Sequence, residues 1–213
     1  MIDRKTQDTI KWAAESGELF AYFGYGSLVN RTTHRTETHG AIRAAVRGWR
    51  RHWQDRSYKA EHAISMLSVK AESDDEHSLP GLLVFDQMQN LPALDEREGG
   101  YDRRVVHASD IELEIDFGFE GPIFIYEARP PVHENRRHGI LQSYLDAVLQ
   151  GYLKEYGENY VHRFLVDTHA FHAPVIRDRH APRYSRHVET SEKERGLFDA
   201  LLGEHGVEHT DTL

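Results

Sequence analysis

The sequence predicts an α+β fold in which strands come first and helices follow. Three observations carry this prediction. Residues 18–129 contain short apolar runs broken by glycine and polar turns, which is typical of strands. Residues 141–156 repeat apolar side chains at helical spacing. Ser191 and Glu194 then form a capping-box pattern before a further apolar segment, which predicts a last helix.

Local patterns justify the remaining elements in order along the chain. Residues 3–16 are predicted to form a short polar helix, because a narrow apolar stripe recurs along them and Gly17 follows as a stop. A second short helix is expected over 90–99, with Pro92 in its first turn, where proline is tolerated. Residues 19–29 are predicted to form a buried strand that runs into a glycine loop. The other predicted strands cover 44–54, 63–71, 81–86, parts of 101–117, and 122–128.

The order of these elements predicts how the 213 residues are organised. We expect an N-terminal helix over 1–17, a strand-rich core over 18–130, and a helical C-terminal extension over 131–213 packed on the same domain. The apolar face of the helix at 141–156 carries tyrosines and fits packing on the same chain or a homodimer contact.

Composition excludes several functional classes. The chain has no cysteine, which rules out a disulfide scaffold, thiolate zinc fingers, iron–sulfur clusters and a cysteine nucleophile. Its net charge of −9 repels phosphate backbones, so a nucleic-acid partner is not expected. No apolar run approaches the ~18 residues of a membrane span, and no secretory signal is evident. We therefore expect a cytoplasmic protein without membrane partners.

The first candidate functional segment is Phe23-Gly24-Tyr25-Gly26-Ser27-Leu28. A strand that ends in two glycines can expose backbone N–H groups, since glycine can adopt positive φ and lets a ligand approach closely. Such a loop can hold a carboxylate or a developing oxyanion. The same residues also fit a simple turn with Tyr25 in the core.

The second segment is Leu94-Asp95-Glu96-Arg97-Glu98-Gly99-Gly100-Tyr101, which sets three acidic groups beside a double glycine. A carboxyl desolvated at this helix end would have a raised pKa and could take and return a proton. On a helix Asp95 and Glu98 share a face, whereas Glu96 points elsewhere. A solvated, charged helix end is the alternative.

Together the two segments resemble the gamma-glutamyl cyclotransferase superfamily. FGYGSL is similar to the substrate loop of its ChaC-type branch, and LDEREGGY is similar to its catalytic segment. Residues 48–54 (GWRRHWQ) resemble a further ChaC-type strand, and 123–127 resemble the strand that carries a pocket tyrosine. The resemblance covers roughly residues 20–128 and implies a small, mixed, mostly antiparallel β-barrel with flanking helices.

The resemblance also implies a reaction and a set of roles. The substrate's α-amine attacks its own γ-carbonyl, which releases 5-oxoproline and an amine without a cofactor or a metal. Glu98, the glutamate directly before glycine, would be the acid/base residue. The substrate-binding residues would be Tyr25, Gly26, Ser27 and Leu28 of the loop, with Tyr101 and Tyr126 lining the pocket.

Departures from the family pattern leave the small-molecule substrate open. Leu28 stands where the gamma-glutamyl-amino-acid branch has asparagine, and the ChaC-type lysine between RE and GGY is missing. Glutathione, gamma-glutamyl amino acids and gamma-glutamyl amines all remain possible. A gamma-glutamylamine cyclotransferase and a non-catalytic binding module on the same fold are the alternative functions.

Histidines and arginines of the C-terminal extension are the last candidate functional residues. The chain has 15 histidines, and those near His169 and His172 could suggest a metal site. Pro174 and Pro182 argue against the long helix that would align them, so solvated or structural histidines are the simpler interpretation. Four arginines at 177, 179, 183 and 186 are expected to be solvated or ion-paired; the alternative is that one binds a substrate carboxylate.

Overall fold

The structure, a computed structural model, describes residues 4–34, 38–56, 64–72, 77–115, 118–130 and 138–211. The chain forms two compact units, each assembled from separate stretches of sequence. Unit 1 comprises Met1–Tyr25, His34–Arg50 and Val69–Arg129, and unit 2 comprises Gly26–Thr33, Arg51–Ser68 and Pro130–Leu213. The predicted domain division after residues 17 and 130 stays a prediction.

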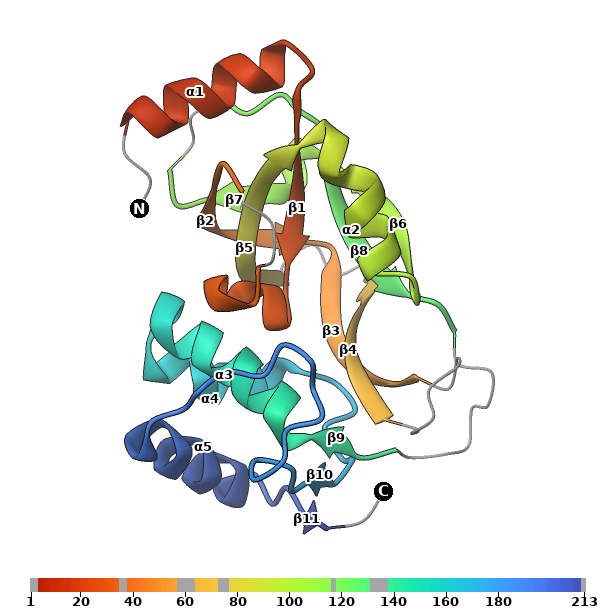
Figure 1. The fold of residues 1–213 in the computed structure, drawn as a ribbon, viewed down its shortest axis with the longest axis vertical. Helices are drawn as coiled ribbons and strands as arrows, with labels where there is room; N and C mark the ends of the chain where they lie inside the picture. The colour runs from red at the N-terminus through yellow and green to blue at the C-terminus, as the bar shows by residue number, and fades with distance from the viewer. Residues whose placement is uncertain are drawn as a thin grey trace. The chain divides into compact units, whose positions relative to one another are not determined.

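Unit 1 is built on a six-stranded sheet with the order β6-β8-β1-β5-β2-β7 (Figure 1). Neighbouring strands are antiparallel except β1 and β8, which run parallel. The strands are β1 (Leu19–Gly24), β2 (Gly40–Arg47), β5 (Ser78–Gln87), β6 (Tyr101–Val106), β7 (Ile111–Leu113) and β8 (Ile123–Ala128). This mainly antiparallel sheet, with helices beside it, confirms the predicted α+β class.

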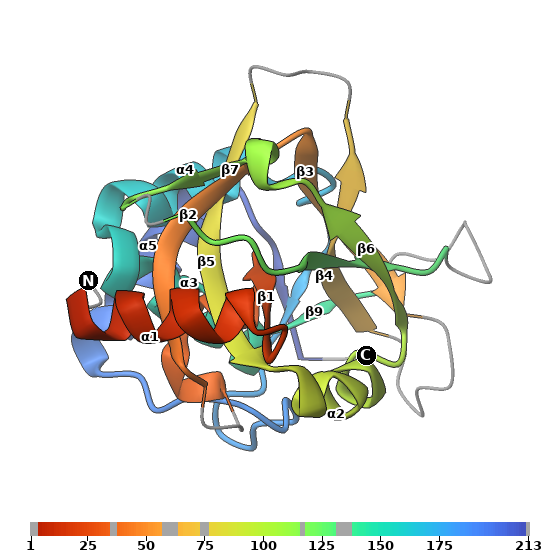
Figure 2. The same ribbon diagram turned by 90° about the horizontal axis from the view of Figure 1, so that it is seen from above.

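Strand β1 is the centre of the unit 1 core. All six of its residues are buried, because both faces of the apolar run are covered. Helix α1 (Arg4–Glu15) crosses the end of β1, β2 and β5 (Figures 1 and 2) and buries Ile10 and its neighbouring alanines. Gly17, with φ +75°, ends this helix as predicted, since the left-handed region favours glycine.

The predicted strand at 44–54 is divided into two strands, because the chain bends at Gly48. Strand β2 ends at Arg47, Gly48 has φ +76°, and β3 (Trp49–Arg56) then pairs with β4 (Ile64–Ala71). Glycine adopts this φ more readily than other residues, so Gly48 allows the bend. The strand-like residues on both sides of Gly48 hide the bend in the sequence pattern.

A short helical segment connects β5 to β6. The 3-10 turn η3 (Met88–Asn90) leads into α2 (Leu91–Arg97), with Pro92 in the first turn as predicted. The carboxylate of Asp86 orders this entry, because it accepts hydrogen bonds from Gln87 N at 2.8 Å and Asn90 Nδ2 at 2.7 Å. A second 3-10 turn, η4 (Ala108–Asp110), connects β6 to β7.

Unit 2 contains the helical C-terminal extension. Helix α3 (Gln142–Tyr156) packs against α4 (Glu158–Asp167), α5 (Glu192–Glu204) and the 3-10 turn η1 (Ser27–Val29), which η2 (Arg31–Thr33) follows. Strands β9 (Ile140–Leu141), β10 (Val175–Ile176) and β11 (His209–Thr210) form a small parallel sheet. Because α3 is covered on several sides, its residues from Gln142 to Tyr152 are all buried.

Sequence reasoning missed helix α4. Gly157, with φ +84°, ends α3 and at the same time precedes the first residue of α4. A glycine at such a position looks like the end of helical structure, although here it separates two helices. Among the described residues, no helix is long and apolar enough to cross a membrane.

The predicted capping box at the start of α5 is confirmed. The Ser191 hydroxyl accepts from Glu194 N at 3.2 Å, and Glu194 Oε2 accepts from Ser191 N at 2.7 Å. Burial alone would raise the pKa of Glu194. Hydrogen bonds donated by the backbone and side chain of Ser191 and by Gln150 lower this pKa below its usual value.

The capping box makes the stability of the protein depend on pH. Because the folded-state pKa of Glu194 is lowered, its stabilisation is present above the unfolded value of about 4.3 and is lost as pH falls through the folded value. Urea unfolding should show Glu194→Gln less stable than the wild type by about 0.5–1 kcal/mol at neutral pH. The difference should vanish in acid, and a difference that stays constant with pH would contradict this account.

Candidate functional site

The structure divides the seven predicted site residues between the two units. Unit 1 holds Tyr25, Glu98, Tyr101 and Tyr126, and unit 2 holds Gly26, Ser27 and Leu28. The peptide bond between Tyr25 and Gly26 joins the two groups in sequence.

Tyr25 and Tyr126 are brought together in unit 1. The Tyr25 hydroxyl donates to the backbone oxygen of Tyr126 at 2.6 Å, and both residues are buried. The Tyr126 hydroxyl donates in turn to Asp95 Oδ1 at 2.7 Å. Burial raises the pKa of Tyr126, and the bond to Asp95 raises it further. Tyr126 is therefore a neutral donor fixed at the end of this chain.

Glu98 lies directly after α2, where the helix ends. Its N–H donates to Leu94 O at 2.9 Å, and its carbonyl accepts from Tyr101 N at 2.7 Å. Its Oε1 lies 3.0 Å from Arg97 Nε, with only 13% of the Glu98 side chain and 16% of the Arg97 side chain exposed. Two backbone hydrogen bonds therefore fix the main chain at Glu98, and the ion pair with Arg97 positions its carboxylate.

The neighbouring acidic residues have different surroundings. Asp95 accepts from Tyr126 and also forms an ion pair with Arg103 Nη1 at 2.7 Å. Glu96 is exposed. Asp95 and Glu98 thus share the less exposed side of α2, as helical spacing predicts, and Asp95 is committed to a structural hydrogen bond.

Sequence reasoning missed Tyr22, which belongs to the surroundings of Glu98. Tyr22 lies on β1 and is almost completely buried. Burial raises its pKa; the charge of Arg97 opposes this rise, and the charges of Asp86 and Glu98 add to it. A tyrosine in an otherwise apolar strand was the available signal, since a buried phenol needs a polar partner.

The loop at Gly26 begins unit 2. Val29 N donates to Gly26 O, and Asn30 N donates to Ser27 O, both at 3.0 Å. The positive φ considered for this loop is absent, because Gly26 has φ −123° and Gly24 is not among the positive-φ glycines. Glycine at 26 instead permits a close approach of neighbouring side chains. A Cβ there would lie 3.3 Å from Tyr144 Oη and 3.4 Å from Leu67 Cδ1.

Ser27 is tied to the C-terminal extension. Its Oγ accepts a hydrogen bond from the Tyr184 hydroxyl at 2.8 Å, although 157 positions separate the two residues. Leu28, next in the loop, is half-buried. Residues whose role the sequence left open therefore contact the predicted substrate loop.

The arginines of the extension divide by their partners. Arg177 pairs with Asp211 at 3.3 Å, and Arg179 pairs with both Asp146 and Asp199. Arg186 Nε donates to the Tyr184 hydroxyl at 2.9 Å. Arg186 is therefore the arginine of this group that the structure links to Ser27, through Tyr184. Among the described residues, no group of three or more histidine or acidic side chains is placed to hold a metal ion.

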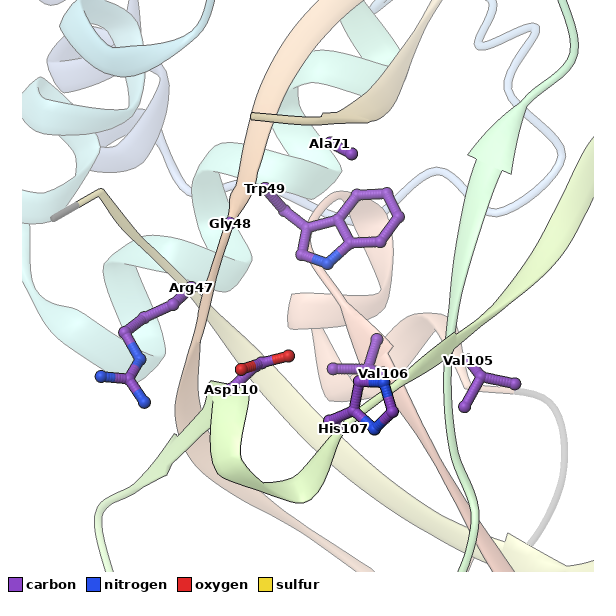
Figure 3. A pocket seen from close by; sticks show the side chains of 8 residues that line it. All are labelled: Arg47, Gly48, Trp49, Ala71, Val105, Val106, His107 and Asp110. Atoms are coloured by element: carbon purple, nitrogen blue, oxygen red, sulfur yellow. The ribbon is translucent and has the colours of Figure 1, made fainter. Parts of the chain in front are cut away.

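Unit 1 also contains a pocket of about 500 Å³ at one end of β6 (Figure 3). Trp49, His107 and Asp110 bring an aromatic ring, an imidazole and a carboxylate to its wall. None of the predicted site residues lines it. The full lining is Arg47, Gly48, Trp49, Ala71, Val105, Val106, His107 and Asp110.

Comparison with solved structures finds the same arrangement of elements. A gamma-glutamyl cyclotransferase aligns with a TM-score of 0.52 and 15% identity, over 86% of this chain and 99% of that one. YkqA from Bacillus subtilis aligns with a TM-score of 0.52 and 16% identity, over 73% of this chain and 56% of YkqA. This chain thus spans little more than half the length of YkqA.

Sequence comparisons do not extend this likeness. No protein-family model matches the sequence, and no curated protein matches it. The fold expected from the motifs FGYGSL and LDEREGGY is nevertheless confirmed by the structural comparison. The chain has the gamma-glutamyl cyclotransferase fold.

Proposed function

We propose that the protein is a gamma-glutamyl cyclotransferase with Glu98 as its general acid/base. The single observation that carries this proposal is the position of Glu98. Its carboxylate is largely buried at the end of α2 and is paired with Arg97, and its charge adds to the rise in the pKa of Tyr22 and Tyr126 that burial causes first. A carboxylate held in this way is suited to accept a proton and return it.

The reaction is an internal acyl transfer. The substrate's α-amine attacks its γ-carbonyl carbon, a C–N bond forms, and the carbonyl becomes a tetrahedral oxyanion. Glu98 takes a proton from the attacking nitrogen and gives it to the leaving nitrogen, so that the old amide bond breaks. The products are 5-oxoproline and a free amine, and no net proton is gained or lost.

The loop residues have a binding role in this proposal. The backbone of Tyr25, Gly26, Ser27 and Leu28 grips the glutamyl α-carboxylate and helps to stabilise the oxyanion. The 3-10 turn after Gly26 fixes this backbone, which reduces the cost of ordering it when substrate binds. In this proposal Tyr101 and Tyr126 line the substrate-binding site.

Ring closure requires few further catalytic groups from the protein. The attacking amine and the carbonyl already belong to one molecule, so holding them in a reactive geometry supplies much of the acceleration. Besides this positioning, the reaction requires one group that transfers a proton and one site that binds the anion. The absence of cysteine from the chain is compatible with this chemistry, because no nucleophilic side chain is required.

The proposal is tested by 5-oxoproline release from a panel of substrates, measured by mass spectrometry. The panel contains glutathione, several gamma-glutamyl amino acids and several gamma-glutamyl amines, each with and without a chelator. Chelator-insensitive release from one class establishes the reaction and names the leaving group. No release from any member by well-folded protein would overturn the proposal and favour a binding module.

A further inference from the structure

The predicted substrate loop in unit 2 is held by side chains of the C-terminal extension that the proposed mechanism does not use. Arg186 Nε donates to the Tyr184 hydroxyl at 2.9 Å, and the Tyr184 hydroxyl donates to Ser27 Oγ at 2.8 Å. Tyr184 and Ser27 are each only 7% exposed. The extension therefore determines the hydrogen bonding of a loop residue 157 positions away.

Each of these hydrogen bonds has a defined donor. Arginine can only donate, so the Tyr184 oxygen accepts from Arg186. The Tyr184 hydroxyl in turn donates its hydrogen to Ser27 Oγ. Ser27 Oγ thereby accepts, and its single hydrogen must point to another group. Among the described residues of unit 2, no side chain or carbonyl accepts that hydrogen. The Ser27 hydroxyl is thus a buried donor available to a ligand.

Tyr184 is itself held firmly. Its N–H donates to Ser143 Oγ at 3.2 Å, and Ser143 Oγ donates to the buried carboxylate of Asp178 at 2.6 Å. Its ring packs edge-on against Tyr144 at 4.9 Å between centroids. Tyr144 is the residue whose hydroxyl lies against Gly26. The phenol can therefore set the orientation of Ser27 without moving.

The indole N–H of Trp53 is a second buried hydrogen-bond donor, and its ring packs against Tyr144, the same residue that contacts Tyr184. Trp53 is 5% exposed, and its ring lies 6.0 Å from Tyr144, edge to face. Nothing among the described residues accepts from its indole Nε1. A buried donor without an acceptor costs free energy, which a ligand with an acceptor oxygen would recover. Two available donors and the Arg186 cation favour an anionic ligand.

We propose that Tyr184 and Arg186 complete, with Ser27, a carboxylate-binding site for the α-carboxylate of the gamma-glutamyl group. The choice of this ligand rests on the proposed function. Tyr184 is a positioning residue that directs the Ser27 hydroxyl at a carboxylate oxygen. Arg186 places a positive charge behind this chain of hydrogen bonds and strengthens each donor along it.

The site should act on binding and leave the chemical step nearly unchanged. The α-carboxylate is present in the ground state and the transition state alike, so an interaction with it is uniform. Loss of that interaction raises KM and leaves kcat almost constant. A purely structural defect would lower the active fraction and reduce kcat instead.

Two conservative variants test the proposal, each with a matched control. Tyr184→Phe removes only the hydroxyl, and Tyr160→Phe is its control on α4. Arg186→Gln removes the charge, and Arg183→Gln is its control at an exposed position. Calorimetry measures binding of L-glutamate and of isoglutamine, whose α-carboxylate is a carboxamide. The KM and kcat for the best substrate of the panel are measured in parallel.

We expect glutamate binding to weaken about tenfold in Tyr184→Phe and Arg186→Gln, with KM raised in proportion. The ratio of the affinity for glutamate to the affinity for isoglutamine should fall towards one in these two variants. Both control variants should match the wild type. Unchanged glutamate affinity in both variants would overturn the proposal, even in an active enzyme. Glutamate binding that depends on Tyr184 in a protein that releases no 5-oxoproline would support the site and overturn the proposed function.

Discussion

Replacing Glu98 by glutamine is expected to lower kcat at least ~100-fold while the protein stays folded. Glutamine keeps the shape of the side chain and can accept a hydrogen bond from Arg97. It cannot take a proton from the attacking amine or return one to the leaving nitrogen. Because the proposed role of the carboxylate is to act on the reacting atoms, kcat should fall much more than KM rises. The measurement is 5-oxoproline release at saturating substrate.

The neighbouring acidic residues supply the controls for this variant. Glu96→Gln changes an exposed carboxylate of the same helix and should keep full activity. Asp95→Asn alters the acceptor of the Tyr126 hydroxyl and should have a smaller effect than Glu98→Gln. Circular dichroism confirms that each variant is folded. An active Glu98→Gln protein beside an inactive Glu96→Gln or Asp95→Asn protein would contradict the assignment of Glu98.

Replacing Gly151 by alanine is expected to destabilise the protein by about 1–3 kcal/mol. Gly151 lies inside α3, where alanine would normally stabilise the helix. Here an added Cβ would lie 2.6 Å from Asn30 N and 2.9 Å from Asn30 Cα. These are backbone atoms, so the loop from Gly26 to Thr33 must move away from the helix. Urea unfolding measures the loss of stability.

A matched glycine in α5 separates this clash from helix propensity. Gly203 has nothing within 4 Å of an added Cβ, so Gly203→Ala should stabilise the protein by roughly 0.5–1 kcal/mol. The opposite signs of the two substitutions are the specific expectation. Because Asn30 also donates to Ala147 O and Gln150 Oε1, Gly151→Ala should raise KM as well. A stabilised Gly151→Ala protein would contradict the close packing of the loop on α3.

Much of the fold could be predicted because the relevant signals are local. The apolar run of β1 and the capping box of α5 each require only neighbouring residues. The bend at Gly48 and helix α4 could not be found in this way. Gly48 interrupts a continuous strand-like pattern, and Gly157 resembles the end of a helix although another helix follows.

The candidate site was predictable only in its local parts. Helical spacing alone separates Asp95 and Glu98 from Glu96, because residues three apart share a helix face. The hydrogen-bond partners of the loop residues were not predictable, because the hydrogen bond from Tyr184 to Ser27 joins segments that are distant in the sequence. Local patterns carry no information on such pairs, so only the folded chain reveals that the C-terminal extension contacts the loop.

The central claim is that the substrate's own amine, and not water, attacks the γ-carbonyl. Turnover in water labelled with oxygen-18 tests this claim most directly, with mass spectrometry of the products of the best gamma-glutamyl substrate. Internal attack predicts 5-oxoproline without label, since no water oxygen enters the lactam. Glutamate carrying oxygen-18 in its γ-carboxylate as the first product would show hydrolysis and contradict the account.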